Sequence, residues 1–529
     1  MNNLKLCILS SAVALGLLSG CETTKEAAKE AAVNADYLIT NGKVFLGDGS
    51  GLQMVDVAIC GKKVCAIEPT NKPHQIKANA IVDAKGKIVS PGFIDPHTHT
   101  LEELTSSDKK ANLNYLTQGV TTLINGNDGG GTYKIDELAK QLEQNGIGTN
   151  VAVFAGHNSV RRAVIGMENR PATDAEIERM KALLEQAMLE GAIGLSTGLY
   201  YVPGSYAETH EVIELAKVAQ KYGGIYDTHL RDEATFNIGF IAALEEAIEI
   251  TDKANIHLHL AHIKALGVDA WGLSTQAIDI INKAKAAGSS ISADHYPWLA
   301  SGTKMHSAIM PKWVMADSKD AFYQRLNDPE LKDRLVKEIS ENIRRRGGPD
   351  ALLVTAFSDS SIVGKTLKQL AEALELSPAE AAMKLVQRGS IRVASFNMSE
   401  RDLKNFMTQP WVVTSSDGTN GHPRKYASFA KKFDTYVMAK GYLSVEDFII
   451  RSSSQTANIL GLKERGLLQQ GYAADVVIWD PKTYKANADF ANWNKLSSGV
   501  DSVWVNGEKV ISAGAFTQVF AGQFLKHQN

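Results

Sequence analysis

The sequence lacks an extended run of lysine and arginine and has no large excess of charge of either sign. Its 56 basic and 59 acidic residues leave a formal net charge of -3. Proteins that bind nucleic acid usually present a concentrated basic surface, so we exclude nucleic acid as a partner. The composition, with 44% apolar and 22% charged residues over 529 positions, is typical of a globular protein with a large core.

Long apolar runs are also absent. Residues 6–18 form a run of about a dozen mostly apolar residues, whereas a membrane-spanning helix needs roughly twenty. The run follows Lys5 and ends in small residues, which predicts a signal peptide over residues 1–20. Residues 18–21 resemble a bacterial lipobox, which implies that Cys21 is lipidated. An ordinary cleaved signal followed by a chance cysteine is the alternative.

The segment after Cys21 contains no large apolar residue before Val33. Residues 21–35 are rich in Ala, Lys, Glu and Thr, so we interpret them as a tether that cannot form a core of its own. The residue after Cys21 is Glu22 rather than Asp, which by resemblance to lipoprotein sorting favours the outer membrane. We therefore expect a lipid-anchored protein of the bacterial cell envelope that faces the periplasm.

Cysteine is scarce, with four residues in the whole chain. Cys60 and Cys65 flank a predicted tight turn between two short strands. An oxidising compartment permits a disulfide between them, but directly paired cysteines on neighbouring strands are also found as buried thiols. The spacing leaves both states open.

Short β-branched and apolar runs separated by turn residues occur at both ends of the chain. Residues 36–90 predict a small antiparallel β-unit, and a similar pattern returns in residues 461–529. We expect the two ends to pair into one small β-sandwich.

Between the two ends, residues 91–460 alternate apolar strands with amphipathic helices, which predicts a closed (β/α)8 barrel of the TIM type. One predicted helix is capped by Thr173 and ends at Gly191. The gap before the last strand is too long for one helix, so we predict a helical insertion at about residues 312–400. The eight predicted strands are residues 93–95, 121–125, 151–155, 192–195, 224–228, 256–261, 291–296 and 411–414.

Polar residues follow several of these strands, where a barrel of this kind carries its catalytic groups. The first strand leads into an H-x-H motif, and an extended chain places both imidazoles of such a motif on one face. A single histidine at a strand end is usually structural, but a set after four separate strands predicts a site for one or two Zn²⁺ or similar divalent ions. The candidate ligands are His97, His99, His229, His262 and Asp417.

Several longer motifs resemble one enzyme family. PGFIDPHTH from Pro91 and GYAADVVIWDP from Gly471 are similar to amidohydrolases in general. Six further motifs resemble more specifically the N-acyl-D-amino-acid deacylases, or D-aminoacylases, and they extend over almost the whole chain after residue 35. These motifs are GHNSVRRAVIG, GAIGLSTGLYYVPGSYA, YDTHLRDEA, LAHIKALG, DHYPWLASGT, and TSSDG followed by HPR. The resemblance implies a metal-dependent hydrolase acting on linear amides.

The chain departs from that family at one position. The family commonly has a cysteine metal ligand in a GNCG-like loop after the second strand, whereas this chain has Asp128 there. A carboxylate can bind or bridge metal ions, although it is a harder ligand than a thiolate. We expect Asp128 to be a ligand, because no lysine stands at the fourth strand end to supply a carbamate bridge. The alternative is that Asp128 is only a turn residue.

The resemblance also implies substrate contacts. Lys264, Tyr296 and Arg424 match family positions that hold the substrate α-carboxylate, and Tyr201 matches another substrate-facing tyrosine. Arginine can clamp a carboxylate with two hydrogen bonds, and lysine supplies a point charge. The alternative for Lys264 and Arg424 is an exposed surface charge.

The implied reaction is amide hydrolysis by a metal-activated water, with release of a carboxylate and a D-amino acid. Asp417 would accept the proton of the water and return it to the leaving amine. A D-specific dipeptidase and a cyclic amidase of the hydantoinase or dihydroorotase type are alternatives. A non-catalytic lipid-anchored binding protein is a further alternative, which the intact histidine and aspartate set argues against. The oligomeric state and the acyl and side-chain preferences do not follow from the sequence.

Overall fold

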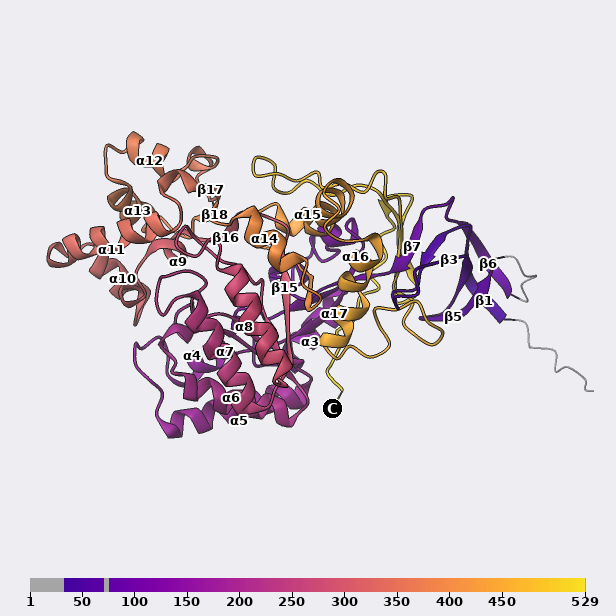
Figure 1. The fold of residues 1–529 in the computed structure, drawn as a ribbon, viewed down its shortest axis with the longest axis horizontal. Coiled ribbons are helices and arrows are strands. Elements are labelled where there is room, and N and C mark those ends of the chain that lie inside the picture. The colour runs from indigo at the N-terminus through magenta and orange to yellow at the C-terminus, as the bar shows by residue number, and fades with distance from the viewer. Residues whose placement is uncertain (1–32, 71–75, 529) are drawn as a thin grey trace, which may run out of the picture.

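The computed structural model describes residues 33–70 and 76–528 (Figure 1). The predicted signal peptide, Cys21 and most of the tether lie outside the described residues. The tether prediction is wrong for residues 33–35, because they belong to β1 (Val33–Thr40). Val33 and Ala35 pair with the parallel strand β6 (Ile76–Asp83), and Ala35 is buried. No helix within the described ranges is long and apolar enough to cross a membrane.

The barrel prediction is confirmed, with eight parallel strands in chain order. The short strand β11 (Ala155–Gly156) continues the line of the third barrel strand and pairs with the fourth. The last strand meets the first through a parallel bridge between Thr98 and Gly418 and a hydrogen bond from the Ser416 amide to Asp95. The barrel strands are β8 (Phe93–Asp95), β9 (Val120–Asn125), β10 (Asn150–Val153), β12 (Gly194–Gly198), β13 (Ile225–His229), β14 (Leu258–Leu260), β15 (Ile291–His295) and β19 (Val412–Thr414).

Helices cover the outside of this barrel. In α5, Thr173 and Glu176 form a reciprocal capping box, and Gly191 ends the helix with φ of +109°, as the sequence predicts. One face of α5 is buried in the core of the barrel and carries Ile177, Met180, Leu184 and Met188. The long outer helices are α3 (Ile135–Asn145), α5 (Asp174–Glu190), α6 (Thr209–Lys221), α7 (Phe240–Ala254) and α8 (Ser274–Ala286). Shorter helices are α1 (Leu101–Leu104), α2 (Leu113–Leu116), α4 (His157–Val164), α14 (Glu400–Met407), α15 (Arg424–Lys431), α16 (Val445–Ser452) and α17 (Ser454–Ile459).

The insertion between β15 and β19 forms a lobe beside the barrel (Figure 1). It contains the predicted helices and has its own apolar core. Its helices are α9 (Met305–Ile309), α10 (Lys319–Leu326), α11 (Lys332–Arg345), α12 (Leu367–Ala373) and α13 (Pro378–Val386). It also holds an antiparallel sheet that the sequence analysis missed, β16 (Ser301–Lys304), β18 (Arg392–Ser395) and β17 (Leu352–Ala356). The insertion therefore begins before residue 312, because β16 already pairs with β18.

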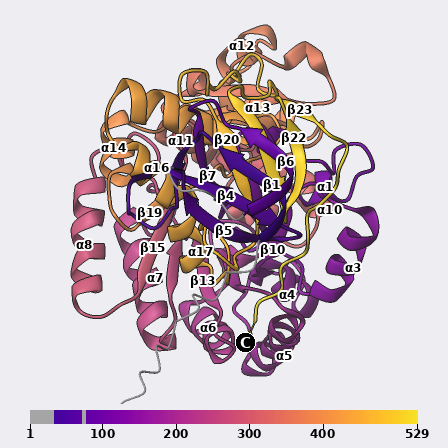
Figure 2. The same ribbon diagram turned by 90° about the vertical axis from the view of Figure 1, so that its right-hand side faces the viewer.

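The two ends of the chain meet in two sheets at the opposite side of the barrel (Figure 2). The N-terminal strand β7 (Ile88–Pro91) pairs with the C-terminal strand β20 (Val476–Trp479), which joins both ends. One sheet contains β4 (Val55–Cys60), β5 (Lys63–Pro69), β1 and β6; the other contains β7, β20, β2 (Lys43–Phe45), β3 (Leu52–Gln53), β21 (Val500–Val505), β22 (Glu508–Ser512) and β23 (Ala515–Phe516). The N-terminal unit is mixed rather than antiparallel, because β6 runs parallel to β1. Cys60 and Cys65 form a disulfide.

Candidate metal centre

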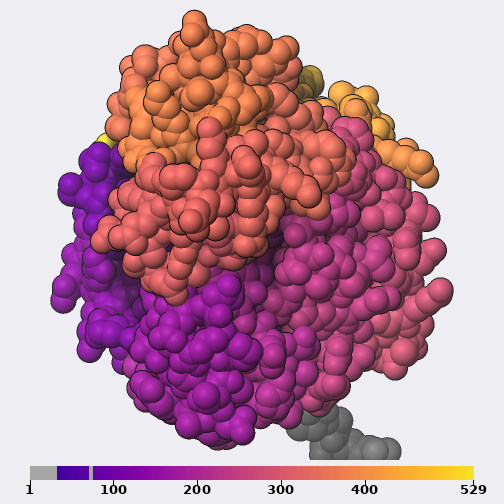
Figure 3. Space-filling model, turned by 90° about the vertical axis from the view of Figure 1, so that its left-hand side faces the viewer, coloured from indigo at the N-terminus to yellow at the C-terminus, as the bar shows by residue number. Residues whose placement is uncertain are grey.

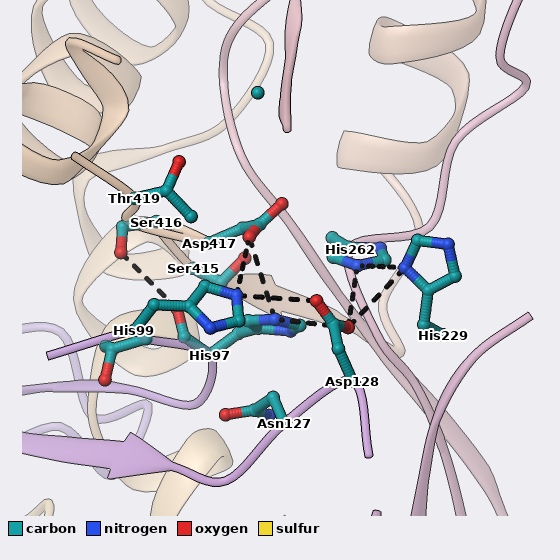
Figure 4. Close-up of polar contacts among 12 residues, drawn as sticks. His97, His99, Asn127, Asp128, His229, His262, Ser415, Ser416, Asp417 and Thr419 are labelled. Atoms are coloured by element: carbon teal, nitrogen blue, oxygen red, sulfur yellow. Dashed lines mark hydrogen bonds and ion pairs between the residues drawn. The ribbon is translucent and has the colours of Figure 1, made fainter. Parts of the chain in front are cut away.

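The six predicted metal ligands lie together at the carboxyl end of the barrel (Figure 4). Each side chain comes from a strand end or from the loop directly after a strand, so the parallel strands bring together residues that are far apart in the sequence. His97 and His99 follow β8, Asp128 follows β9, His229 ends β13, His262 follows β14 and Asp417 follows β19.

Asp128 lies between the four histidines (Figure 4). Its Oδ1 atom is 3.6 Å from His97 Nε2, 3.5 Å from His229 Nδ1 and 3.2 Å from His262 Nε2. Its Oδ2 atom is 3.4 Å from His99 Nε2. The carboxylate therefore contacts both the pair after β8 and the pair after β13 and β14.

Asp417 lies beside His97 and His99. Its Oδ1 atom is 3.2 Å from His99 Nε2 and 3.7 Å from His97 Nε2. On the other side, His229 Nδ1 lies 2.9 Å from His262 Nε2. The six residues thus form two adjacent groups of nitrogen and oxygen atoms that share Asp128.

These separations fit a divalent metal ion. Ligand bonds of about 2.0–2.1 Å in a tetrahedron place neighbouring ligand atoms roughly 3.3 Å apart. Candidate ligand atoms of His97, Asp128, His262 and Asp417 all lie within 4.8 Å of one another. In addition, His97 is fully buried and neither of its ring nitrogens has a hydrogen-bond partner, which is costly for a polar group unless it binds something else.

The backbone at three of these residues is unusual. Asp128, His262 and Asp417 have φ values of +57°, +36° and +46°, a region that residues with side chains rarely adopt. Such conformations cluster at functional sites, where the surrounding structure fixes them. The loop that carries Asp128 is also closely packed, since a Cβ atom on Gly129 would lie 2.8 Å from the Gly198 amide nitrogen.

Buried carboxylates hold the ligand-bearing loops. Asp294 accepts hydrogen bonds from the His262 amide and the Ser415 hydroxyl, and its Oδ2 atom is 3.0 Å from His259 Nε2. Asp95 accepts hydrogen bonds from the His97 and Ser416 amides. These bonds fix the position of the loops from which the candidate ligands extend.

The charges at the centre favour a bound cation. Burial would raise the pKa of Asp128, but the neighbouring His97 and His262 hold this pKa well below its usual range. Burial and Lys264 oppose protonation of His262, yet the carboxylates of Asp128 and Glu233 raise its pKa to about 9. The carboxylates are therefore ionised at neutral pH, and the proton on His262 is one that a divalent ion would displace.

Three of the four predicted substrate residues, Tyr201, Lys264 and Arg424, lie beside candidate ligands and line the cavity over them. Tyr296 is buried and is not part of that lining. The Arg424 guanidinium carbon lies 4.9 Å and Lys264 Nζ lies 5.7 Å from the ring centroid of Tyr296. The Tyr201 ring centroid is 4.7 Å from that of His229. Lys264 and Arg424 are buried, so the alternative that they are exposed surface charges is wrong.

The structure also gives both cations partners that the sequence analysis did not predict. Arg424 Nη1 is 2.6 Å from Asp417 Oδ2, and Lys264 Nζ is 2.6 Å from Glu233 Oε1. Lys264, with His229 and His262, lowers the pKa of buried Glu233 to about 2 against the effect of burial. Glu233 was missed, although its place four residues after His229 in YDTHLRDEA was a signal that could have found it.

A cavity of about 1020 Å³ opens over these residues. Its lining includes His99, Asp128, His229, His262 and Asp417 from the barrel. Other loops of the barrel also line it, and the insertion forms the remaining part of its wall with residues of β16, β18 and the segment after β16. The candidate metal centre is therefore accessible to a small molecule, and the insertion forms part of the binding space.

The fold and this site define the class of protein: an α/β-barrel hydrolase with a candidate metal centre. Residues 80–511 match the model of the amidohydrolase family. The chain is 30% identical to a D-aminoacylase of Alcaligenes xylosoxydans xylosoxydans, with 93% of this chain and 97% of the relative covered. It is 29% identical to an N-acyl-D-aspartate deacylase of the same organism, covering 92% and 94%.

Solved structures agree with these relatives. The N-acyl-D-glutamate deacylase of Bordetella bronchiseptica, determined with zinc and a phosphonate mimic of the tetrahedral intermediate, has a TM-score of 0.78 at 27% identity, covering 93% of this chain and all of that one. A D-hydantoinase has a TM-score of 0.55 at 14% identity over 93% of this chain and 99% of its own, which shows the fold alone. This chain belongs to the D-aminoacylase group of the amidohydrolase family.

Proposed function

We propose that the protein hydrolyses the amide bond of N-acyl-D-amino acids and releases a carboxylate and a D-amino acid. One observation carries this proposal: Asp128 and four histidines form a candidate metal centre, and the buried cations Lys264 and Arg424 lie beside it in the same cavity. The similarity to D-aminoacylase and to N-acyl-D-aspartate and N-acyl-D-glutamate deacylases supports this substrate class.

The proposed metal ligands are His97, His99, Asp128, His229, His262 and Asp417. The nitrogen and carboxylate donors suit one or two Zn²⁺ ions. An ion bound there would supply the activation of a water molecule and the polarisation of the acyl carbonyl. The protein holds the ligands in place before substrate arrives, because hydrogen bonds to Asp95 and Asp294 fix their loops.

We propose that Arg424, Lys264 and Tyr296 hold the substrate α-carboxylate, with Tyr201 on the opposite part of the cavity wall near His229. Both cations are buried in ion pairs with Asp417 and Glu233. An incoming carboxylate would therefore share or replace these partners. Charge-assisted hydrogen bonds of this kind are stronger than neutral ones, so they can orient the amide relative to Asp417.

Asp417 is the proposed proton shuttle. It accepts the proton of the attacking water and returns it to the amine nitrogen, which leaves poorly without a proton. The Asp417→Asn change keeps the shape of the side chain but removes the acceptor. Turnover should fall by several orders of magnitude, since general acid-base catalysis alone contributes about 10²–10⁴.

This test requires metal content and substrate-analogue binding to be measured beside turnover. Retention of the histidine-held ion with lost turnover supports the shuttle, and near-normal turnover contradicts it. The conservative Asp417→Glu variant keeps a proton acceptor. It should recover part of the activity that Asp417→Asn loses.

A cyclic amidase, a D-specific dipeptidase and a non-catalytic binding protein are the alternatives. Cyclic amidases usually have a lysine-derived bridge, whereas the shared position here is occupied by Asp128 and no lysine ends β12. A dipeptidase would use the same centre and differs only in the acyl group. Parallel assays of N-acetyl-D-leucine, glycyl-D-leucine and a hydantoin distinguish the three reactions.

We also propose that the mature protein is anchored by a lipid on Cys21 in the bacterial outer membrane, facing the periplasm. The lipobox-like residues 18–21 support this proposal. Wild-type protein should incorporate a labelled fatty acid in a bacterial host, and Cys21→Ala should not. Cys7→Ala, which removes a cysteine inside the predicted signal, is the matched control. A wild type without label would contradict the proposal.

A further inference from the structure

The part of the cavity wall that the insertion forms carries two facing cations. Lys304 of β16 and Arg392 of β18 are direct partners in the antiparallel register, and both line the cavity. Like charges directly opposite each other on neighbouring strands destabilise a sheet. Lys304 is exposed and Arg392 is partly buried, so an anion bound in the cavity would offset their repulsion. Figure 3 shows the insertion, in salmon and orange, lying against the purple and magenta segments of the barrel.

The residues that the structure describes supply no such anion. Within residues 33–70 and 76–528, neither the Lys304 nor the Arg392 side chain forms an ion pair with a carboxylate. The Nη2 atom of Arg392 is buried without a hydrogen-bond partner, which costs free energy in a folded protein. The nearby carboxylates of Asp417 and Glu233 are already paired with Arg424 and Lys264.

The positive region extends along the same wall. Burial and the neighbouring Lys304, Lys312 and Arg392 lower the pKa of His306 to about 4, so this imidazole is neutral and lies among three cations. Lys312 Nζ is 3.5 Å from the ring centroid of Tyr200, which places it over an aromatic surface rather than against a carboxylate. Arg392 and Arg424 line the same cavity, and burial together with the charge of Arg424 lowers the pKa of Arg392 to about 10.

We propose that Lys304 and Arg392, with Lys312, bind a second carboxylate of the substrate. This inference rests on the proposed function and names a narrower substrate class, N-acyl-D-amino acids with two negative charges. The second carboxylate can belong to the amino-acid side chain, as in N-acetyl-D-glutamate, or to the acyl group, as in an N-succinyl amino acid. Both present the same chemistry to the three cations.

Four substrates distinguish a carboxylate on the amino-acid side chain from a carboxylate on the acyl group. N-acetyl-D-glutamate is compared with its neutral isostere N-acetyl-D-glutamine, and N-succinyl-D-leucine is compared with N-acetyl-D-leucine. We expect kcat/KM to be at least ten-fold higher for the charged member of one pair, as a charged hydrogen bond typically contributes. Equal values of kcat/KM within both pairs overturn the inference while leaving the proposed function intact.

Variants test whether the preference for the charged substrate depends on Lys304 and Arg392 themselves. Lys304→Met and Arg392→Met should each reduce the ratio of kcat/KM between the charged and the neutral substrate about ten-fold, and Arg392→Lys should retain part of that ratio. Lys365→Met is the matched control, because Lys365 is an exposed lysine of the insertion that does not line the cavity. An equal effect of Lys365→Met would show that only long-range charge is involved and would overturn the inference.

A binding measurement makes the outcome independent of catalysis. Calorimetric titration of zinc-loaded protein with D-glutamate and D-glutamine, and with succinate and succinamate, compares charged and neutral ligands directly. Tighter binding of one charged ligand by about ten-fold, lost in Arg392→Met, supports the subsite even if no substrate is hydrolysed. Equal affinities in both comparisons overturn it. Absence of hydrolysis for all four substrates contradicts the proposed function alone.

Discussion

Asp128 is a carboxylate that contacts the ring nitrogens of four histidines, at a position where the resembling family commonly has a cysteine. A carboxylate offers two oxygen atoms, and here Oδ1 faces three of the histidines and Oδ2 faces the fourth. A thiolate would make all such contacts through one sulfur atom. Asp128 would therefore help to hold one or two divalent ions, with harder donors than a thiolate site provides.

Asp128→Ala should lower the amount of zinc retained after dialysis and reduce activity, because both histidine pairs lose their shared partner. Asp128→Cys should retain at least one ion, with selectivity shifted toward Zn²⁺ over Mn²⁺. Metal content of the purified proteins, measured by mass spectrometry, checks this. Asp136→Ala, which removes a partly exposed carboxylate on α3, is the control. Unchanged zinc content in Asp128→Ala would show that Asp128 is a turn residue and not a metal ligand.

Arg424 determines the basicity of Asp417. Burial would raise the pKa of Asp417, but the guanidinium of Arg424 holds it well below its usual range. Arg424→Met removes that charge, so the pKa of Asp417 should rise and the acidic limb of the kcat/KM profile should move to higher pH. Arg424→Lys should move it less. The acidic limb reports the coupled site as a whole, so its shift between wild type and variant is the informative quantity. An acidic limb at the wild-type pH in Arg424→Met would show that Asp417 does not contribute to the limb.

Sequence patterns correctly predicted which residues lie together at the candidate metal centre. They did not predict the ion pairs that the neighbouring residues form. The positions of His97, His229, His262 and Asp417 after separate strands follow from barrel geometry. The ion pair between Lys264 and Glu233 depends on how two loops pack against each other. Residue spacing does not encode that packing.

At the scale of elements, α5 combines a reciprocal capping box with a buried apolar face. Thr173→Ala should lower the free energy of unfolding by about 1 kcal/mol, because the Glu176 amide loses its acceptor. Thr173→Ser keeps the hydroxyl and should change the stability little. Urea unfolding monitored by circular dichroism compares the three proteins. Equal stability of Thr173→Ala and wild type would show that the cap does not contribute.

The eight barrel strands could be predicted because each is an apolar run between helical patterns, followed by polar residues. The three-stranded sheet of the insertion could not, because β16, β17 and β18 are each short and stand far apart among helices. Their pairing is set by contacts between distant segments. The first residues of β1 were assigned to the tether for a similar reason, since their partner strand β6 lies about forty residues later.

On the scale of the whole molecule, the barrel carries the candidate ligands, the sandwich joins both ends of the chain, and the insertion completes the cavity (Figures 1 and 2). The sandwich lies on the side of the barrel away from the insertion. Changes in the insertion should therefore alter substrate preference more than metal binding. This division explains how one metal centre can serve related enzymes with different acyl amino acids.

The central claim is that a divalent ion in this cavity is required for hydrolysis of N-acyl-D-amino acids. The most direct measurement is the rate of amine release from N-acetyl-D- and N-acetyl-L-leucine and -glutamate, with metal content determined on the same protein before chelation, after chelation and after return of Zn²⁺. We predict hydrolysis of a D-substrate that falls with the metal content and recovers with Zn²⁺, and little hydrolysis of the L-substrates. A D-specific activity that persists in metal-free protein, or a zinc-loaded protein inactive on every D-substrate, would contradict the account.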